Sequence, residues 1–214
     1  MKRGHFITIE GSEGAGKSTN LSHLCAQLTD LGIAFYQTRE PGGTPLAEEI
    51  RQLLLTPRQE VVNPTAELLM MFAARAQHIQ EEIRPRLEAG QWVVCDRFTD
   101  ATYAYQGYAR GLPLEQIEHL EQWVQDDLHP DLTLFLDVPP EIGAERIQGR
   151  DQDRMEQEAQ TFFELVRAGY LARAGASERF RVIDAGLGLP EVIEQVRNTV
   201  IEYVTKTREV EQVH

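Results

Sequence analysis

The chain has 214 residues, of which 42% are hydrophobic, and a formal net charge of −13 at pH 7. This length fits one domain with a sizeable apolar core. The acidic excess argues against non-specific binding to nucleic acid or to an anionic membrane, because both need a positive field. The first apolar run is too short for a signal sequence or a membrane span, so we expect a soluble cytoplasmic protein.

Short apolar runs rich in β-branched residues predict five strands. They span residues 5–10, 33–40, 91–96, 130–138 and 179–185. The central runs are nearly continuous and do not alternate with polar residues, which is typical of strands buried on both faces of a parallel sheet.

Helical patterns occupy the intervals between these strands. The clearest helices are predicted at 17–32, 46–55, 63–90, 100–128 and 189–207, with a frayed tail at 208–214. Asn63 and Pro64 suit the N-cap and first position of the third helix. Pro85 lacks a backbone N–H and should kink this helix or end its regular part.

The alternation of strands and helices predicts an α/β fold with three layers and a parallel sheet. Such folds bind ligands beyond the carboxyl ends of their strands. The polar residues that follow the strands are therefore the candidates for a site: 10–18, 39–44, 96–97, 137 and 184–188. Cys25 and Cys95 have no metal-like spacing and are expected to be buried, reduced thiols.

The clearest motif is "GSEGAGKS", residues 11–18, which matches G-x-x-x-x-G-K-[ST] in full between a predicted strand and a predicted helix. The glycines allow backbone N–H groups to surround a phosphate, and the helix N-terminus adds a positive dipole end. Lys17 would reach the β- and γ-phosphates, and Ser18 would offer its hydroxyl to Mg²⁺. The strand–loop–helix context disfavours a glycine-rich turn with a chance lysine.

The loop alone does not distinguish a switch, a motor and a kinase. GTPases read guanine with N/T-K-x-D, and the nearest string here, at 205–208, lacks the acid and falls in a predicted helix. A GTP switch is therefore disfavoured, and large motor ATPases usually need a longer chain.

A kinase for a phosphorylated acceptor needs a second cluster of positive charge, because donor and acceptor repel each other. Arg39, Arg51, Arg75 and Arg97 lie at predicted strand ends or on neighbouring helices. For the first three a surface role is the alternative. Arg97 directly follows a buried strand, which favours a functional role over a surface role. Asp96, the residue before it, is at the strand end where P-loop enzymes hold an acid near the Mg²⁺ ion.

Five segments, in order, resemble one family. "EGSEGAGKST", "TREPGGTPLAEEIR", "FAARAQH", "CDRFTDATYAYQGYARG" and "DRMEQE" are similar to segments of the bacterial thymidylate kinases, over about residues 5–205. The resemblance implies a P-loop NTPase fold made of a single nucleoside monophosphate kinase domain, 1–214, with a short mobile lid at about 146–158. It implies phosphorylation of dTMP to dTDP with MgATP, on the route to dTTP, by a homodimer. The interface of this homodimer could involve the helices at 64–89 and 100–128.

The resemblance also implies residue roles. ATP would be bound by Gly11, Ser12, Glu13, Gly14, Ala15, Gly16, Lys17, Ser18 and Thr19, with Ser18 and Asp96 near the metal. Glu13 would in addition meet the 3′-hydroxyl of dTMP, although a solvated loop acid is the alternative. The acceptor would be bound by Arg39, Glu40, Arg51, Met71, Phe72, Arg75, Arg97, Thr102, Tyr105 and Gln106.

Within this acceptor set the implied roles differ. Arg51 and Arg97 would bind the phosphate, and Arg39 and Glu40 would lie in a loop beside it. Arg75 would bond a thymine carbonyl, Thr102 and Gln106 would read the base edge, and Tyr105 would lie near C2′.

One position departs from the family pattern. Many relatives stack an aromatic ring on thymine four residues before the arginine, where this chain has Met71; its aromatic residue, Phe72, is three before. Both positions neighbour Arg75 on a helix. Either a thioether or a ring would cover the base, and we expect Phe72 to supply part of the wall. Simple core packing is the alternative.

The charged stretch 146–158 holds Arg146, Arg150 and Arg154 at spacings of four, which would share one face if helical. A solvated helix face is one interpretation. The other is a lid that neutralises the transferred phosphoryl group. The phosphate loop lacks the arginine that some family members carry there, so the lid should supply it, with Arg150 as first choice and Arg154 as second.

Two further functions are alternatives. One is a kinase for another nucleoside monophosphate on the same fold. The other is a non-catalytic, nucleotide-dependent partner-binding module, which the intact Lys17, Ser18, Asp96 and Arg97 disfavour.

Overall fold

Five parallel strands form the central sheet of the computed structural model, which describes residues 2–149 and 153–212. The strands are β1 (Phe6–Glu10), β2 (Phe35–Arg39), β3 (Trp92–Asp96), β4 (Leu132–Asp137) and β5 (Phe180–Asp184). Their order is β2-β3-β1-β4-β5, and all four pairings are parallel. The predicted sheet is confirmed.

The central strand β1 is buried along its whole length, as its uninterrupted apolar pattern predicts. Ile7 pairs with Val94 of β3 and with Leu132 of β4. Because β1 and β3 are neighbours, the loop that follows Glu10 lies beside the residues that follow Asp96. The backbone N–H of Arg97 donates to the carbonyl of Ile9 at 3.0 Å and extends this contact beyond the strands.

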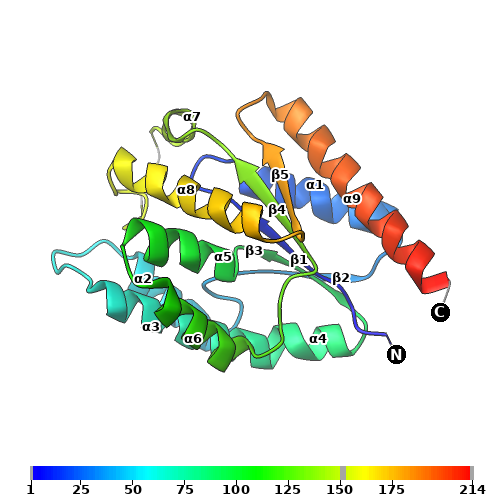
Figure 1. The fold of residues 1–214 in the computed structure, drawn as a ribbon, viewed down its shortest axis with the longest axis horizontal. Helices are drawn as coiled ribbons and strands as arrows, with labels where there is room; N and C mark the ends of the chain where they lie inside the picture. The colour runs from blue at the N-terminus through cyan, green and yellow to red at the C-terminus, as the bar shows by residue number, and fades with distance from the viewer. Residues whose placement is uncertain (1, 150–152, 213–214) are drawn as a thin grey trace.

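Helices cover both faces of the sheet (Figure 1). On one face α1 (Lys17–Asp30) packs beside α9 (Leu189–Gln212). The other face carries the remaining long helices: α2 (Pro45–Leu55), α3 (Pro64–His78), α6 (Leu114–Gln125) and α8 (Gln160–Ala176). Apolar side chains of α1, α9, β1 and β4 form the largest core cluster. The three-layer α/β prediction is confirmed.

The helix predicted at 63–90 is a composite of α3, a π-helical turn η1 (Ile79–Ile83) and α4 (Arg84–Glu88). Asn63 caps it as predicted, since its Oδ1 accepts from the N–H of Thr65 at 2.9 Å. The irregular turn comes just before Pro85, which cannot donate to the preceding turn, so the predicted end of the regular helix near this residue is confirmed.

Two predictions about helices need correction. Residues 100–128 do not form one helix, because α5 (Thr99–Thr102) and the π-helical η2 (Tyr103–Ala109) end before Gly111, which has a left-handed φ of 73°, and α6 begins afterwards. α9 continues to Gln212 instead of fraying at 208, and Arg208 donates to the carbonyl of Leu31 at 2.6 Å.

The described residues of the charged stretch 146–158 do not meet the condition of being one helix. The helix α7 (Pro140–Arg146) ends at Arg146, and residues from Asp153 to Glu158 form turns. Arg146 and Arg154 therefore do not share a helix face, and Arg150 lies outside the described residues. Over the described part of the chain no helix is long and apolar enough to cross a membrane.

Candidate active site

A cleft of about 620 Å³ opens beyond the carboxyl ends of the strands and collects most of the predicted site residues. Its walls include Glu13, Gly14, Gly16, Lys17, Ser18, Thr19, Arg39, Glu40, Arg51, Met71, Arg75, Asp96, Arg97, Thr102, Tyr105 and Gln106. Residues from five separate parts of the sequence thus meet in one space, as expected for a parallel sheet.

The phosphate loop has the backbone that its glycines permit. Gly14 has a left-handed φ of 73°, and a Cβ there would lie 2.1 Å from the carbonyl oxygen of Gly143. Gly16, at φ 83°, is the N-cap of α1. The Lys17 Nζ donates to the carbonyl oxygens of Gly11 and Ser12 at 3.0 and 2.9 Å, so the ammonium lies over its own loop. Burial and the charge of Arg97 lower the pKa of Lys17.

Glu13 faces Arg97, not the solvent. The Arg97 guanidinium forms an ion pair with Glu13 Oε1, and the Tyr105 hydroxyl donates to the same oxygen at 3.3 Å. Burial alone would raise the pKa of Glu13, but Arg97 and Lys17 lower it to about 2. Arg97 has a φ of 67°, an uncommon conformation for a residue with a side chain and one that clusters at functional sites.

Asp96 and Ser18 fit the requirements of a Mg²⁺ ion. Both line the cleft, and Asp96 Oδ1 is buried without a hydrogen-bond partner. Among the described residues no group of three or more His, Cys, Asp and Glu side chains could hold a metal. A site with one carboxylate and one hydroxyl suits Mg²⁺, which completes its shell with phosphate oxygens and water.

The opposite wall contains a buried chain of hydrogen bonds. Arg75 Nε donates to Glu40 Oε2 at 2.7 Å, and Arg75 Nη2 donates to Thr102 Oγ1 at 3.0 Å. His78 bridges Glu40 Oε1 at 3.0 Å and Thr38 Oγ1 at 2.7 Å. Burial raises the pKa of Glu40, but Arg75 and His78 outweigh it, so the pKa is lowered and the carboxylate stays charged.

Arg75 lines the cleft and has one donor atom that is not bonded to another protein group. Its Nη1 is buried and has no partner, while the guanidinium carbon lies 4.8 Å from the ring centre of Phe72. Phe72 is in a core cluster with Leu68 and is not part of the cleft wall, whereas Met71 lines the cleft. The expectation that Phe72 forms part of the wall therefore finds no support, and Met71 takes this place.

Two further predicted arginines lie at the rim of the cleft. Arg39 forms an exposed ion pair with Glu48 at 2.9 Å. Arg51 Nη1 donates to the carbonyl of Pro41 at 2.9 Å, and burial together with the charge of Arg39 lowers the pKa of Arg51. A concentration of guanidinium groups that lowers a pKa favours the binding of an anion between them.

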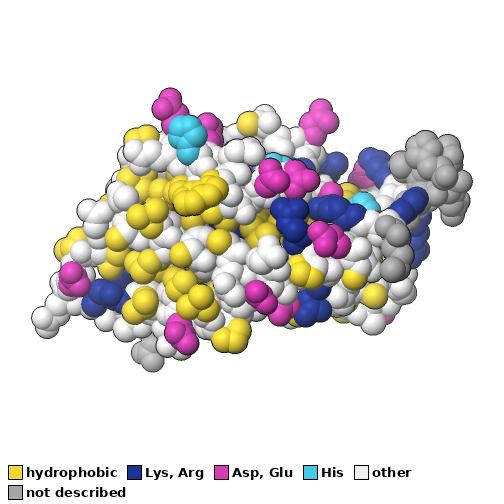
Figure 2. All heavy atoms as spheres, turned by 90° about the horizontal axis from the view of Figure 1, so that it is seen from below, with side chains coloured by type: hydrophobic (Ala, Val, Ile, Leu, Met, Phe, Trp, Pro, Cys, Tyr) yellow, Lys and Arg dark blue, Asp and Glu magenta, His cyan; other side chains and the backbone are white. Residues whose placement is uncertain are grey.

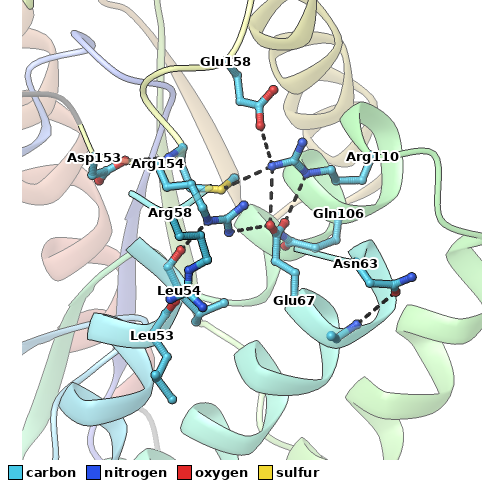
Figure 3. A network of polar contacts seen from close by, with 12 residues as sticks. Leu53, Leu54, Arg58, Asn63, Glu67, Gln106, Arg110, Asp153, Arg154 and Glu158 are labelled. Atoms are coloured by element: carbon cyan, nitrogen blue, oxygen red, sulfur yellow. Dashed lines mark hydrogen bonds and ion pairs between the residues drawn. The ribbon is translucent and has the colours of Figure 1, made fainter. Parts of the chain in front are cut away.

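The arginines of the 146–158 stretch have separate environments. Arg154 donates through Nη2 to Glu67 Oε2 and through Nε to the carbonyl of Leu54, both at 2.6 Å, and it is not part of the cleft wall (Figure 3). Arg146 does line the cleft, and its Nη1 donates to the carbonyl of Ala185 at 2.9 Å and to that of Gly14 in the phosphate loop at 3.3 Å.

The sequence pattern gave no sign of one group near the cleft, Glu67, and it placed Arg146, the last residue of α7, only among the arginines of the proposed lid. Glu67 is in the first turn of α3, where an acid is expected for helix stability alone, yet its side chain is completely buried. Only the surroundings of Glu67 distinguish it from a solvated acid.

The predicted ATP-contacting residues Gly11, Ser12 and Ala15 are not part of the cleft wall. Ser12 and Ala15 are buried, at 4% and 2% exposure. A backbone N–H can still face a phosphate when its side chain does not, so their assignment stays a prediction.

Comparisons with known proteins agree with this geometry. The sequence model of the family described as thymidylate kinase matches residues 9–196. A thymidylate kinase of Pseudomonas putida is 58% identical over 191 residues, which is 88% of this chain and 91% of that protein. Thymidylate kinases of Teredinibacter turnerae and Pseudomonas fluorescens are 55% and 52% identical, over 92% and 96% of this chain and 97% and 99% of those proteins. The chain belongs to the thymidylate kinase family.

Proposed function

We propose that this protein transfers the γ-phosphoryl group of ATP to dTMP, giving ADP and dTDP on the route to dTTP. One observation carries the proposal: the phosphate loop and the buried Arg75–Glu40 pair line the same cleft, together with Arg97 and Arg51. A site that must hold two anions in line needs this concentration of positive charge. Residues 1–214 would act as one nucleoside monophosphate kinase domain with a lid at about 146–158.

On the donor side, the phosphates of ATP would replace hydrogen-bond partners that Lys17 has within the protein. Lys17 would leave the carbonyls of Gly11 and Ser12 for the β- and γ-phosphates, while the N–H groups of the loop and the start of α1 surround them. Ser18 and Asp96 would hold Mg²⁺, which when bound neutralises phosphate charge. The backbone of the loop is already shaped for this step.

The acceptor phosphate would lie against Arg97 and Arg51, with Arg39 at the rim. Glu13 holds Arg97 in place, and as an ionised acceptor it suits the 3′-hydroxyl of a deoxyribose. Tyr105 donates to the same carboxylate and lines the cleft, so its ring would lie beside a sugar bound at Glu13. This placement supports a preference for a 2′-deoxy sugar, because a ribose hydroxyl would meet an aromatic face.

The base would occupy the pocket lined by Met71, Arg75, Thr102 and Gln106. The unpaired Nη1 of Arg75 is a donor for a thymine carbonyl, and the thioether of Met71 suits the face of the ring. A pocket for one methyl group discriminates by only about 1–3 kcal/mol. We therefore expect some phosphorylation of dUMP beside that of dTMP.

The lid would supply the remaining positive charge during transfer. Arg154 is bound to Glu67 and Arg146 to backbone carbonyls, so each would have to change partners to reach a phosphoryl group. Arg150 remains our first choice for this role.

The deciding experiment is an ADP-release assay with MgATP and a panel of acceptors: dTMP, dUMP, dCMP, dAMP and ribothymidine 5′-monophosphate. We expect the highest kcat/KM for dTMP. Efficient phosphorylation of another acceptor without turnover of dTMP would establish a different nucleoside monophosphate kinase. Nucleotide binding without turnover of any acceptor would support a binding module.

A homodimer is part of the proposal. Exposed hydrophobic side chains gather on the face turned downward in Figure 1, over α3 and α6 (Figure 2). Leu69 on α3 and Trp123 on α6 are 53% and 83% exposed. A contiguous apolar surface of this kind supports association. Sedimentation of the wild type and of Trp123→Glu tests it, and a wild-type monomer at micromolar concentration would refute it.

A cytoplasmic location also belongs to the proposal. The reaction needs ATP and a nucleotide acceptor, and Cys25 and Cys95 are free thiols, as predicted, which suits a reducing compartment.

A further inference from the structure

Glu67 is a completely buried carboxylate beside the proposed base pocket. It accepts from Gln106 Nε2 at 2.8 Å, from Arg154 Nη2 at 2.6 Å and from Arg110 Nε at 3.3 Å (Figure 3). The three donors come from η2, the turn that follows it and the 153–158 turns. Glu67 thus connects a residue of the cleft wall with the proposed lid.

The protonation state of Glu67 determines whether its side chain can bind hydrogen-bond donors only or also acceptors. Burial raises its pKa, but the hydrogen bonds from Gln106 and Arg154 and the charge of Arg110 outweigh burial, so the pKa is lowered and the group is ionised at neutral pH. An ionised carboxylate only accepts hydrogen bonds. Gln106 must therefore present its NH₂ group to Glu67, because the reversed amide would bring two oxygens together.

This orientation determines what Gln106 offers to a ligand. Because Glu67 holds Nε2, the carbonyl oxygen of this amide does not face Glu67 and can accept from a ligand in the cleft that Gln106 lines. Arg75, in the same wall, offers the unpaired donor Nη1. The pocket therefore combines one fixed acceptor with one fixed donor.

A ring N–H beside a carbonyl is the edge that matches this pair. Thymine and uracil carry it, since N3 bears a hydrogen and C4 a carbonyl. Cytosine has an acceptor at N3 and an amino group at C4, so the acceptor of Gln106 would face an acceptor and Arg75 would face a donor. A buried polar site left unpaired in this way rejects the wrong ligand far more strongly than a missing methyl group does.

We propose that Glu67 is a positioning residue that fixes the Gln106 amide with its carbonyl toward the base, and so makes the pocket select 2,4-dioxopyrimidines over 4-aminopyrimidines. The proposal rests on the proposed function, because it assumes that this cleft binds a pyrimidine monophosphate. Glu67 itself does not line the cleft and would act only through Gln106.

The test compares Glu67→Gln with the matched control Glu158→Gln. Glu158 is ion-paired to Arg110 at 2.7 Å, so the control removes a carboxylate from the same cluster, whereas Gln106 donates to Glu67. The readout is the ratio of kcat/KM for dTMP to that for dCMP, with the competitive Ki of dCMP where its turnover is too slow. This ratio is independent of the fraction of active enzyme.

In Glu67→Gln we expect the ratio to fall by about 10- to 100-fold, the range for a lost hydrogen bond to a charged group. Glu158→Gln should keep the wild-type ratio. If Glu67→Gln does not fold, Glu67→Asp carries the test, because it keeps the charge beside the arginines but withdraws the carboxylate from Gln106.

A double-mutant cycle tests whether Glu67 acts through Gln106. In a Gln106→Leu background, Glu67→Gln should leave the ratio unchanged. An unchanged ratio in a folded Glu67 variant would overturn the inference, as would an equal fall in both backgrounds. A wild type that does not phosphorylate dTMP would instead refute the proposed function, which is a separate result.

Discussion

The two halves of the cleft hold their charges differently. In the donor half, the phosphate loop, the side chain of Lys17 is 10% exposed, and its ammonium hydrogen-bonds to carbonyls of its own loop. In the acceptor half, the Arg75–Glu40–His78 chain, Arg75 and Glu40 are only 3% and 4% exposed and bind each other through side chains. The first arrangement can exchange partners for phosphate, whereas the second is rigid before any ligand arrives.

The difference follows from what each half must recognise. A phosphoryl group moves and changes charge, so its partners gain from being replaceable. A base is recognised by a fixed pattern of donors and acceptors, and buried groups that are already paired hold their positions without reorganisation. Substitutions in the donor half should therefore reduce kcat, and those in the acceptor half should reduce stability and acceptor binding together.

The largest expected effect is that of Lys17→Ala. Loss of the ammonium removes the main side-chain charge on the β- and γ-phosphates, and kcat should fall by roughly 10³-fold or to nothing. The thermal midpoint should stay close to that of the wild type, because Lys17 hydrogen-bonds two carbonyls of its own loop and lies 4.0 Å from Glu13 in the same loop. A variant with near-normal kcat but a much lower midpoint would contradict the distinction between the halves.

Arginine substitutions in the 146–158 stretch come next. Arg150→Ala should lower kcat, by roughly 10³-fold if it acts as arginines do in related phosphoryl transfer, with little change in the Kd of dTMP. Arg154→Ala should mainly disturb Glu67. An active Arg150→Ala beside an inactive Arg154→Ala would show that our assignment within the lid is wrong.

Glu40→Gln tests the acceptor half. It leaves the buried Arg75 charge without its carboxylate, so we expect a loss of about 3–5 kcal/mol in the free energy of unfolding and a higher KM for dTMP. Glu48→Gln is the matched control, because it weakens an exposed arginine pair and should cost about 1 kcal/mol or less. Urea unfolding of both variants measures the contrast, and equal losses would refute it.

Met71→Ala and Phe72→Leu separate the cleft wall from the core behind it. Met71→Ala should raise the KM for dTMP several-fold and change stability little, since Met71 lines the cleft. Phe72→Leu should lower the thermal midpoint, because the ring is in a core cluster, with a smaller effect on KM. The opposite result would place the aromatic ring on the base after all.

A further contrast concerns pH. Burial and the charge of Asp100 raise the pKa of Glu10, at the end of β1, to about 8. Between its ordinary value of 4.5 and 8 the unfolded chain releases this proton first, so its contribution to stability falls as pH rises through this interval. The thermal midpoint of the wild type relative to Glu10→Gln should therefore decline from pH 5 to pH 8. A constant gap would show that Glu10 is ionised throughout.

Several parts of the donor half could be predicted from the sequence because they are local. Eight consecutive residues, Gly11 to Ser18, carry the phosphate loop, and Asn63 caps its own helix. The strands were recognisable because continuous apolar runs suit only a doubly covered sheet. Asp96 and Arg97 could be placed near the loop because parallel strands end at the same edge.

The acceptor half and the lid were decided by tertiary packing. Met71 and Phe72 are adjacent in sequence but point about 100° apart on a helix, and only the neighbouring elements determine which faces the cleft. Glu67 has the sequence context of a solvated helix-start acid, yet three donors from distant segments bury it. Sequence determines local geometry within a few residues. The partner of a long side chain depends on where whole elements pack, and that is settled by the entire core.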